Sequence, residues 1–581
     1  MLPDRPSLLL LIMKSKAVFR IRLIGIGIFL VVTVFSIRLF YLQVVKGSEY
    51  NDQADRQYLR SARTFFDRGS IYFSSKNGKV VPAALLKQEF LLTANPRLIP
   101  KPEEVYDILK PILPDLVEAE FVTEVSDKDK AYTEIKTGLT NEQAEAIKEK
   151  EIKGIYIYKE KRRYYPAERT ASHVLGFMGY HKDDYTGIYG LEKEYNDILT
   201  HRGSGSFASF FAEIFLNAKS TVSDEVVGGE GDVVLTIEPV VQNYTEKVLA
   251  ETVAKYQADA GGMIVMDPNT GEILAMAALP NFNPGERQED IVALPNPLVE
   301  RVFEMGSVVK PLTLAAGIDK GVVTANTKYN DTGSVVLNNR TIMNHDKMAQ
   351  GTVDMQEVIN KSLNTGAVFI MQRLGKDSFR HYMLAFGLGE KTGVDLPGEV
   401  AGLISNLRSP RDIEYATASF GQGIALTPIG ITRAFATLAN GGHLVKPHVV
   451  KEIRYSVGTV KTIKPEVKKN QILKRETTEA VTEVLIKAVD NALLGGSLKL
   501  ANWTVAAKTG TAQMSDGKGR YQEDQYLHSF FGYYPAYHPR FITFMYIVNP
   551  KGAQFSSDTL SHPFMTTAEF LLNYYEVPPD R

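Results

Sequence analysis

The chain of 581 residues contains no cysteine. Disulfide bonds and thiolate metal sites are therefore excluded, and the ten histidines show no spacing typical of metal ligands, so we expect neither a metal nor a cofactor. Neither sign of charge dominates, because 66 basic residues oppose 67 acidic ones. This balance gives no indication of a nucleic-acid partner or of an acidic tail.

Long apolar runs are also scarce, with one exception near the N-terminus. Residues 23–37 carry no charge, and beyond Arg38 the apolar character continues to residue 45, which together is about the length that a bilayer requires. Four cations, Lys14, Lys16, Arg20 and Arg22, lie close before the run, and no small-residue cleavage site follows it. By the positive-inside rule we expect a cytoplasmic segment at 1–22, an uncleaved single-pass anchor at 23–45 in the cytoplasmic (inner) membrane, and export of the remainder. Translation starts at either Met1 or Met13.

The length of the chain exceeds what one hydrophobic core usually serves, so two or more domains are expected. The glycine-rich segment Gly228-Gly-Glu-Gly231 is the predicted boundary. Before it, residues 46–231 are mixed in composition, charged and rich in tyrosine, and no chemistry stands out there. Residues 232–581 form the second predicted domain.

Local signals predict the main elements of this second domain. We expect a strand at 232–237, a helix at 239–256, a hairpin with strands at 262–267 and 272–277, and a helix from Pro428 that is capped by Thr427 and ended by Gly441. An antiparallel sheet with helices on both sides is the economical assembly of such elements. The predicted fold class is α+β. In the first domain, Asn77-Gly78 predicts a further hairpin after Asp67–Tyr72.

A serine and a lysine lie three residues apart where an apolar helix is expected to begin, in Ser307-Val-Val-Lys310. Helical residues at this spacing share one face with Cβ atoms roughly 5–6 Å apart, so the lysine amine can reach the hydroxyl. A hydroxyl is a poor nucleophile without a base beside it. Lysine can be that base if burial or a nearby cation lowers its pKa. The pair predicts an activated serine, and Pro311 suits a first helical turn.

Two further motifs follow Ser307 in order. They are Ser362-Leu-Asn364 and Lys508-Thr-Gly-Thr511. The series Ser-x-x-Lys, Ser-x-Asn, Lys-Thr-Gly is the motif set of penicillin-binding proteins and class A β-lactamases.

Copies of these motifs occur elsewhere, and their context separates them. Some lie far before Ser307 and others lie in polar or glycine-rich stretches that predict loops; they are Ser75 with Asn77, Lys136, Lys391, and Ser515 with Lys518. Lys508 follows the short, partly β-branched stretch 503–507, so we expect it on an edge strand lining a cleft.

These landmarks resemble a class B penicillin-binding protein, from Arg38-Leu-Phe-Tyr-Leu-Gln43 nearly to the C-terminus. Similarity to the division-specific subgroup rests on Phe420-Gly-Gln-Gly423 with Leu426-Thr-Pro428, Leu438-Ala-Asn-Gly-Gly442 and Ser529-Phe-Phe-Gly532. The resemblance implies a serine D,D-transpeptidase that cross-links peptidoglycan stem peptides. It also implies a transmembrane helix, an elongated non-catalytic pedestal (dimerisation-type) domain at 46–231, and a transpeptidase domain at 232–581 with a central antiparallel sheet flanked by helices. Met305 departs from the family, which often has proline there.

The resemblance also assigns roles by position. Ser307 would attack the penultimate D-Ala carbonyl and Lys310 would take its proton. Ser362 with Lys508 would pass a proton to the leaving amine, and Asn364 would bind the peptide and position Lys310. The carboxylate of the donor would be held at the third motif, Thr509, Gly510 and Thr511, and the oxyanion hole would comprise the N–H groups of Ser307 and Thr511.

The implied partners are stem peptides ending in D-Ala-D-Ala, β-lactam antibiotics, a membrane-embedded SEDS-type glycosyltransferase, other division proteins and the lipid bilayer. Two alternatives stay open at this point. One is an elongation-type class B enzyme with the same chemistry, and the other is a non-catalytic β-lactam sensor or scaffold. A soluble β-lactamase is disfavoured, because it needs neither an anchor nor a pedestal.

Overall fold

The computed structural model describes residues 26, 29–36, 38–39, 41, 67–181, 184–201, 229–286, 295–515 and 520–581. Among these residues, no helix combines the length and the apolar composition that crossing a bilayer needs. The predicted cytoplasmic segment at 1–22, and about half of the predicted anchor at 23–45, lie outside the described residues. The described residues from 67 onward divide into two compact units, one within 88–162 and the other within 67–87 and 163–581.

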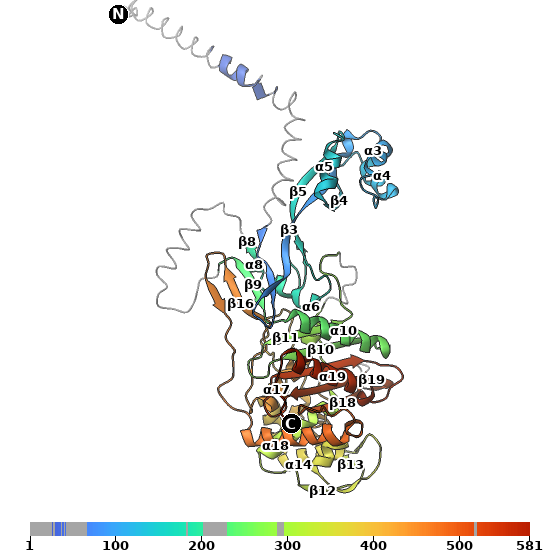
Figure 1. Cartoon of the computed structure of the whole chain (residues 1–581), viewed down its shortest axis with the longest axis vertical. Coiled ribbons are helices and arrows are strands. Elements are labelled where there is room, and N and C mark those ends of the chain that lie inside the picture. Colours follow the sequence, from blue (N-terminus) through green and yellow to red (C-terminus); the bar gives the residue numbers. More distant parts are fainter. Residues whose placement is uncertain are drawn as a thin grey trace, which may run out of the picture. The chain divides into compact units, whose positions relative to one another are not determined.

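The smaller unit is a mixed α/β structure with its own core (Figure 1). Strand β4 (Thr133–Leu139) and strand β5 (Ile155–Tyr164) both pair with β3 (Val80–Ala94). Three helices pack with these strands: α3 (Pro102–Leu109), α4 (Glu118–Ser126) and α5 (Asn141–Lys148). The Thr140 side chain and Gln143 form a reciprocal capping box at the start of α5.

In the larger unit, the predicted N-terminal hairpin is confirmed. Strand β2 (Ile71–Ser74) pairs with β3 across a turn in which Gly78 has a φ of 75°. β2 also pairs in parallel with β9 (Gly231–Leu235), which covers most of the strand predicted at 232–237. Strands β16 (Val450–Tyr455) and β17 (Val460–Thr462) extend this sheet. Short elements complete this region: β1 (Asp67–Arg68), α6 (Ser172–Leu175), β6 (Met178–His181), β7 (Asp184–Gly187), α7 (Gly190–Glu194), α8 (Asn196–Leu199) and β8 (Thr200–His201).

The predicted central antiparallel sheet is confirmed, and it has the strand order β11-β10-β20-β19-β18. Its strands are β10 (Ala260–Met266), β11 (Ile273–Leu279), β18 (Ala506–Ser515), β19 (Tyr521–Tyr534) and β20 (Phe541–Val548). β10 and β11 form the hairpin expected from the sequence. β18, which carries Lys508, is an edge strand, as predicted.

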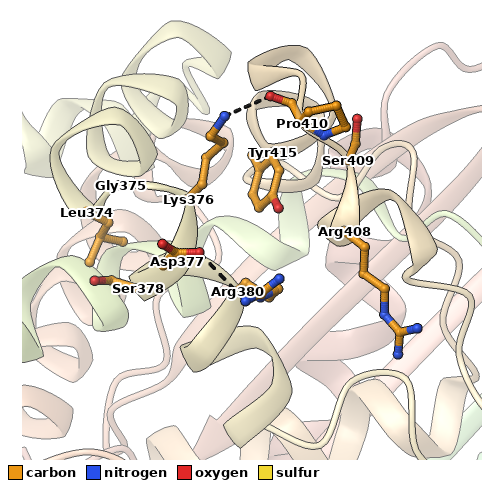
Figure 2. A pocket seen from close by; sticks show the side chains of 10 residues that line it. All are labelled: Leu374, Gly375, Lys376, Asp377, Ser378, Arg380, Arg408, Ser409, Pro410 and Tyr415. Carbon is orange, nitrogen blue, oxygen red and sulfur yellow. Dashed lines mark hydrogen bonds and ion pairs between the residues drawn. The ribbon is translucent and has the colours of Figure 1, made fainter.

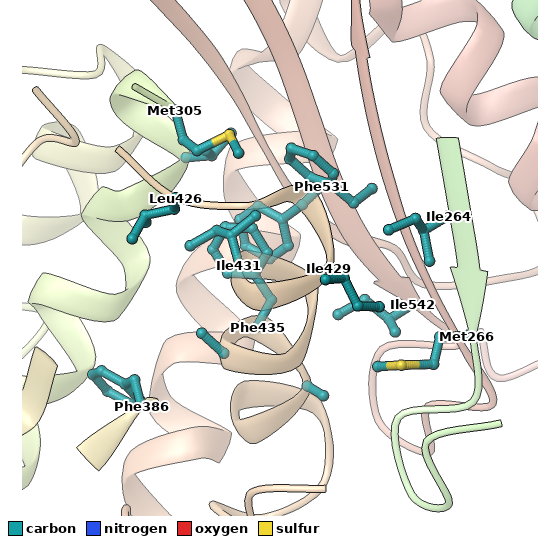
Figure 3. Packing of buried hydrophobic residues seen from close by; sticks show 14 of the residues in the cluster. Ile264, Met266, Met305, Phe386, Leu426, Ile429, Ile431, Phe435, Phe531 and Ile542 are labelled. Carbon is teal, nitrogen blue, oxygen red and sulfur yellow. The ribbon is translucent and has the colours of Figure 1, made fainter. Parts of the chain in front are cut away.

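Helices cover both faces of this sheet, because its strands are apolar on both sides. One face packs against α10 (Pro239–Lys255) and α19 (Ser556–Tyr574), with Phe530 in that core. The next residue, Phe531, points to the opposite face and stacks on Phe435 of α17 (Pro428–Ala439) with ring centroids 3.7 Å apart (Figure 3). The predicted cap of α17 is present, since Thr427 accepts a hydrogen bond from the Gly430 N–H at 3.1 Å.

The second face is completed by a helical region that contains the first two motifs. Its helices are α11 (Pro297–Glu300), α12 (Lys310–Asp319), α13 (Met355–Asn360), α14 (Asn364–Leu374), α15 (Lys376–Ala385), α16 (Asp412–Ala418) and α18 (Arg475–Lys487). Between α12 and α13 lies an arm of four short strands, β12 (Lys328–Asp331), β13 (Ser334–Leu337), β14 (Arg340–Met343) and β15 (Gly351–Asp354). In this arm β12 pairs with β15 and β13 pairs with β14.

Candidate active site

Ser307 lies in a 3₁₀ turn, η4 (Gly306–Val309), immediately before α12. The serine is half-buried between neighbours that are buried. Gly306 has a φ of 65°, and a Cβ at this position would lie 2.8 Å from the Thr511 carbonyl oxygen. Its N–H donates to the Gly421 carbonyl at 3.1 Å. Glycine at 306 therefore lets the serine turn approach the third-motif strand closely.

Lys310 is the first residue of α12 and is 1% exposed. Its amine donates to the carbonyl oxygen of Ser362 and to Ser362 Oγ at 3.1 Å. Burial, and secondarily the charge of Lys508, lower the pKa of Lys310 well below its ordinary value. Burial and a nearby cation, either of which was expected to lower the pKa of this lysine, are thus both present. The Lys310 backbone N–H donates to the Ser307 carbonyl in this turn. Within the described residues no hydrogen bond joins the Lys310 amine to the Ser307 hydroxyl, so the pairing of these two groups stays a prediction.

The second motif lies between α13 and α14. Ser362 has a φ of 55°, a left-handed backbone conformation that non-glycine residues rarely adopt and that often occurs at functional sites. Asn364 begins α14, and its Nδ2 donates to the Met343 carbonyl at 2.9 Å. The structure thus brings Ser362 to Lys310 and connects Asn364 to the β12–β15 arm.

The third motif lies on the edge strand β18. Lys508 is 6% exposed and donates to its neighbour's carbonyl, that of Thr509, at 3.1 Å. Burial lowers the pKa of Lys508 to about 8. Thr509 and Thr511 are half-buried on the other face of the strand, and Thr511 Oγ1 accepts from the Ser556 N–H at 3.0 Å.

Gly510 allows the first and third motifs to pack together. A Cβ here would lie 2.6 Å from Ser529 Oγ and 2.8 Å from the Met305 carbonyl oxygen. Ser529 Oγ donates to that same carbonyl at 2.9 Å. This hydrogen bond therefore connects the central sheet to the turn that contains Ser307. Ser529 was named above only as part of a motif of the resembled family, without a role.

His345 is not singled out by the sequence, in which the ten histidines show no spacing typical of metal ligands. Its ring packs edge-on against Phe555, with centroids 5.6 Å apart. Burial lowers the pKa of His345; Lys310 and Lys508 also lower it, while Asp346 raises it. These two lysines therefore lie within electrostatic range of the imidazole. No spacing in the sequence signals this position.

The duplicate motifs lie elsewhere. Lys136 is on β4 in the smaller unit and pairs with Asp115. Lys391 is in a loop, as predicted, where the Thr392 N–H donates to Glu399 at 2.6 Å. Ser75 is in the turn after β2. The loop prediction was wrong for Ser515, which is the last residue of β18 and pairs with Tyr521, because the strand pairing continues past the third motif; Lys518 lies outside the described residues.

A surface pocket of about 550 Å³ at the start of α15 contains none of the motif residues. Figure 2 shows its lining, in which Lys376 donates to the Pro410 carbonyl and Asp377 pairs with Arg380. Within the described residues, no group of three or more histidine, aspartate or glutamate side chains could hold a metal ion.

Comparison with known families gives two matches. Residues 261–567 match the penicillin binding protein transpeptidase domain, and residues 66–208 match the penicillin-binding protein dimerisation domain. Among solved structures, penicillin-binding protein 3 of Mycobacterium tuberculosis complexed with aztreonam has a TM-score of 0.66 at 23% identity, over 89% of this chain and 98% of that one. Penicillin-binding protein 2X of Streptococcus thermophilus has a TM-score of 0.69 at 21% identity, over 88% and 80%. These two likenesses establish the fold.

Relatives of known sequence match over most of the chain. Stage V sporulation protein D of Bacillus subtilis is 31% identical over 95% of this chain and 84% of its own length. Peptidoglycan D,D-transpeptidase FtsI of Escherichia coli K12 is 29% identical over 75% and 71%. A dimerisation domain followed by a transpeptidase domain, shared with FtsI-type relatives, shows that this chain belongs to the class B penicillin-binding proteins of the division type.

Proposed function

We propose that this protein is a serine D,D-transpeptidase that cross-links peptidoglycan stem peptides during septal wall synthesis, through an acyl-enzyme on Ser307. The observation that carries the proposal is the environment of Lys310. Its amine is buried, its pKa is depressed, and it lies three residues from Ser307 and within hydrogen-bond distance of Ser362. A buried lysine with a depressed pKa can accept the proton of a serine beside it.

In the acylation step, the Ser307 oxygen bonds to the penultimate D-Ala carbonyl carbon while Lys310 takes the hydroxyl proton. Collapse of the tetrahedral intermediate breaks the C–N bond to the terminal D-Ala. Ser362, bonded to Lys310, passes a proton to the leaving amine, and Lys508 assists it. The N–H groups of Ser307 and Thr511 are proposed to bind the oxyanion, and the contact of Gly306 with Thr511 brings their backbones together.

Binding of the donor is assigned to the third motif. Lys508 is cationic below about pH 8 and suits a terminal carboxylate, and the hydroxyls of Thr509 and Thr511 on the same edge strand are proposed to hydrogen-bond that carboxylate. Asn364 is proposed to bind the peptide through its Oδ1, because its Nδ2 is bonded to the Met343 carbonyl. In the second step, an amine of a neighbouring stem peptide attacks the acyl-enzyme, transfers its proton to the base and releases Ser307.

The wider assignments are proposals as well. They are a cytoplasmic segment at 1–22, an anchor at 23–45 in the cytoplasmic membrane, a pedestal at 46–231 and a transpeptidase domain at 232–581 on the outer side. The proposed partners are stem peptides, a SEDS-type glycosyltransferase and other division proteins. β-Lactams are expected to acylate Ser307 as substrate mimics, and the aztreonam complex of the M. tuberculosis relative supports this expectation.

The test is covalent labelling of the purified protein with a fluorescent penicillin, followed by peptide mapping. We expect one label, on Ser307, and none on Ser307→Ala. Ser515→Ala is the matched control, because it removes the serine of the duplicate motif and should label normally. A label on Ser515, or stoichiometric labelling of Ser307→Ala, overturns the assignment.

Labelling does not separate a transpeptidase from a sensor, nor division from elongation. Cross-linked product from donor and acceptor peptides is expected only from a transpeptidase. Depletion of the protein followed by microscopy is expected to give filaments, whereas rounded cells would indicate the elongation-type role.

A further inference from the structure

The carboxylate of Asp331 is the centre of a buried hydrogen-bond network beside the second motif. Asp331 ends β12 and is 1% exposed. Its Oδ1 accepts from Thr365 Oγ1 at 2.6 Å and from the Gly333 N–H at 3.1 Å. Its Oδ2 accepts from the Gln350 N–H at 2.9 Å. Asn344 Nδ2 lies 3.0 Å from Oδ2 and 3.1 Å from Oδ1.

These donors come from two segments that meet at the candidate active site. Gly333, Asn344 and Gln350 belong to the β12–β15 arm, and Thr365 belongs to α14, directly after Asn364. Asn344 Oδ1 also accepts from the Thr365 N–H at 3.2 Å. The network therefore joins the arm to the first turn of α14.

The link extends to Asn364 through one more bond. Met343, which precedes Asn344, accepts a hydrogen bond from Asn364 Nδ2 at 2.9 Å. The position of the Met343 carbonyl follows that of Asn344, which Asp331 holds from both of its oxygens. Asp331, which lies 33 positions before Asn364 and has no hydrogen bond to it among the described contacts, thus influences the direction of the Asn364 amide.

We propose that Asp331 is a positioning residue for the Ser-x-Asn motif, which sets the direction of the Asn364 amide and so the binding of the peptide at Ser307. The role of Asn364 here rests on the proposed function. An ionised carboxylate suits this task, because it accepts at both oxygens and its hydrogen bonds are stronger than neutral ones. Burial raises the pKa of Asp331, but its hydrogen bonds to Thr365 and the other donors bring it below the ordinary value, so the group is ionised at neutral pH.

The test is a double-mutant cycle on the rate of acylation by a fluorescent penicillin. Asp331→Asn replaces an acceptor oxygen by an amide donor and should lower the second-order rate about ten-fold. Asn364→Ala should lower it as well. If Asp331 acts through Asn364, the double variant acylates as slowly as Asn364→Ala alone, whereas a merely structural role gives independent, multiplying losses.

Glu399→Gln is the matched control. Glu399 is also a buried carboxylate, 8% exposed, and its oxygens accept from the Thr392 N–H and Oγ1 and from the Gly393 N–H. It belongs to the Lys391 loop, so its variant should lose thermal stability yet acylate within about two-fold of wild type, as no contact with the motifs is lost. Thr365→Val removes one donor to Asp331 with little change of shape, and a loss of a few-fold is expected from it.

The outcomes separate this inference from the proposed function. Absence of Ser307 labelling in the wild-type protein overturns the proposed function itself. If the wild type is labelled, acylation of Asp331→Asn at the wild-type rate, or multiplying losses in the double variant, overturns the inference. If Asp331→Asn does not fold, the cycle is run with Thr365→Val in its place, and the same non-additivity is required.

Discussion

The amine of Lys310 donates one hydrogen bond to Ser362 Oγ, at 3.1 Å, and another to the Ser362 carbonyl, although 52 residues separate the two. A neutral amine has two N–H donors and one lone pair. Both donors are occupied by Ser362, so the lone pair stays free to accept a proton. Ser362 therefore orients the proposed base, in addition to its proposed role as the relay of a proton.

Lys310→Arg should abolish the proposed general-base function of residue 310 while keeping a cation in place. Guanidinium does not deprotonate in proteins, and loss of a general base costs about 10²- to 10⁴-fold in rate. The measurement is the second-order rate of acylation by a fluorescent penicillin, beside a circular dichroism spectrum to check folding. A folded variant that acylates at near the wild-type rate would show that Lys310 is structural.

The rate of acylation should depend on pH with two limbs. As pH falls through the depressed pKa of Lys310, the base gains a proton and the rate falls. As pH rises through about 8, Lys508 loses the charge that would bind the donor carboxylate, and the rate falls again. Stopped-flow acylation across pH measures both limbs. Lys508→Arg should remove the alkaline limb, because arginine stays charged, and an alkaline limb that persists in this variant contradicts the assignment.

Lys508→Ala and Thr511→Ala should each weaken acylation, whereas Lys136→Ala and Lys391→Ala should have little effect. Lost charge-assisted hydrogen bonds cost about 1.5–3 kcal/mol, which is about ten-fold to more than a hundred-fold in rate. Thermal melts of all four variants separate misfolding from lost chemistry. If Lys391→Ala acylates slowly while Lys508→Ala acylates at the wild-type rate, the third motif has been assigned to the wrong lysine.

Gly510→Ala should separate β18 from the turn of Ser307, since the new Cβ would lie 2.6 Å from Ser529 Oγ. Overpacking of this kind costs about 1–3 kcal/mol, so we expect a lower melting temperature and slower acylation. Gly285→Ala is the control, because its Cβ would meet nothing closer than 3.4 Å. Equal melting and acylation of the two variants would contradict the close-approach argument.

Local chemistry was enough to predict several elements. Thr427, Pro428 and Gly441 mark the ends of α17, because capping bonds and backbone conformation act within a few residues. The hairpin of β10 and β11 and the edge strand of Lys508 were predicted in the same way. The parallel pairing of β2 with β9 was not predictable, since no local signal connects residue 71 to residue 233.

The sequence by itself determined which side chains are proposed to carry the chemistry, because the motif set of Ser307, Ser362 and Lys508 is defined by residue type and order. It did not determine the pKa values or the hydrogen-bond partners of these side chains. The depressed pKa of Lys310 depends on apolar walls and on Lys508, which is nearly two hundred residues away in the chain. The electrostatic interaction of His345 with the two lysines arises in the same way, from segments that are distant in the chain. The hydrogen bond from Thr365 to the buried carboxylate of Asp331 also forms only once the β12–β15 arm packs against α14. Desolvation and hydrogen bonding between distant segments are properties of packing, so the tertiary structure alone decided them.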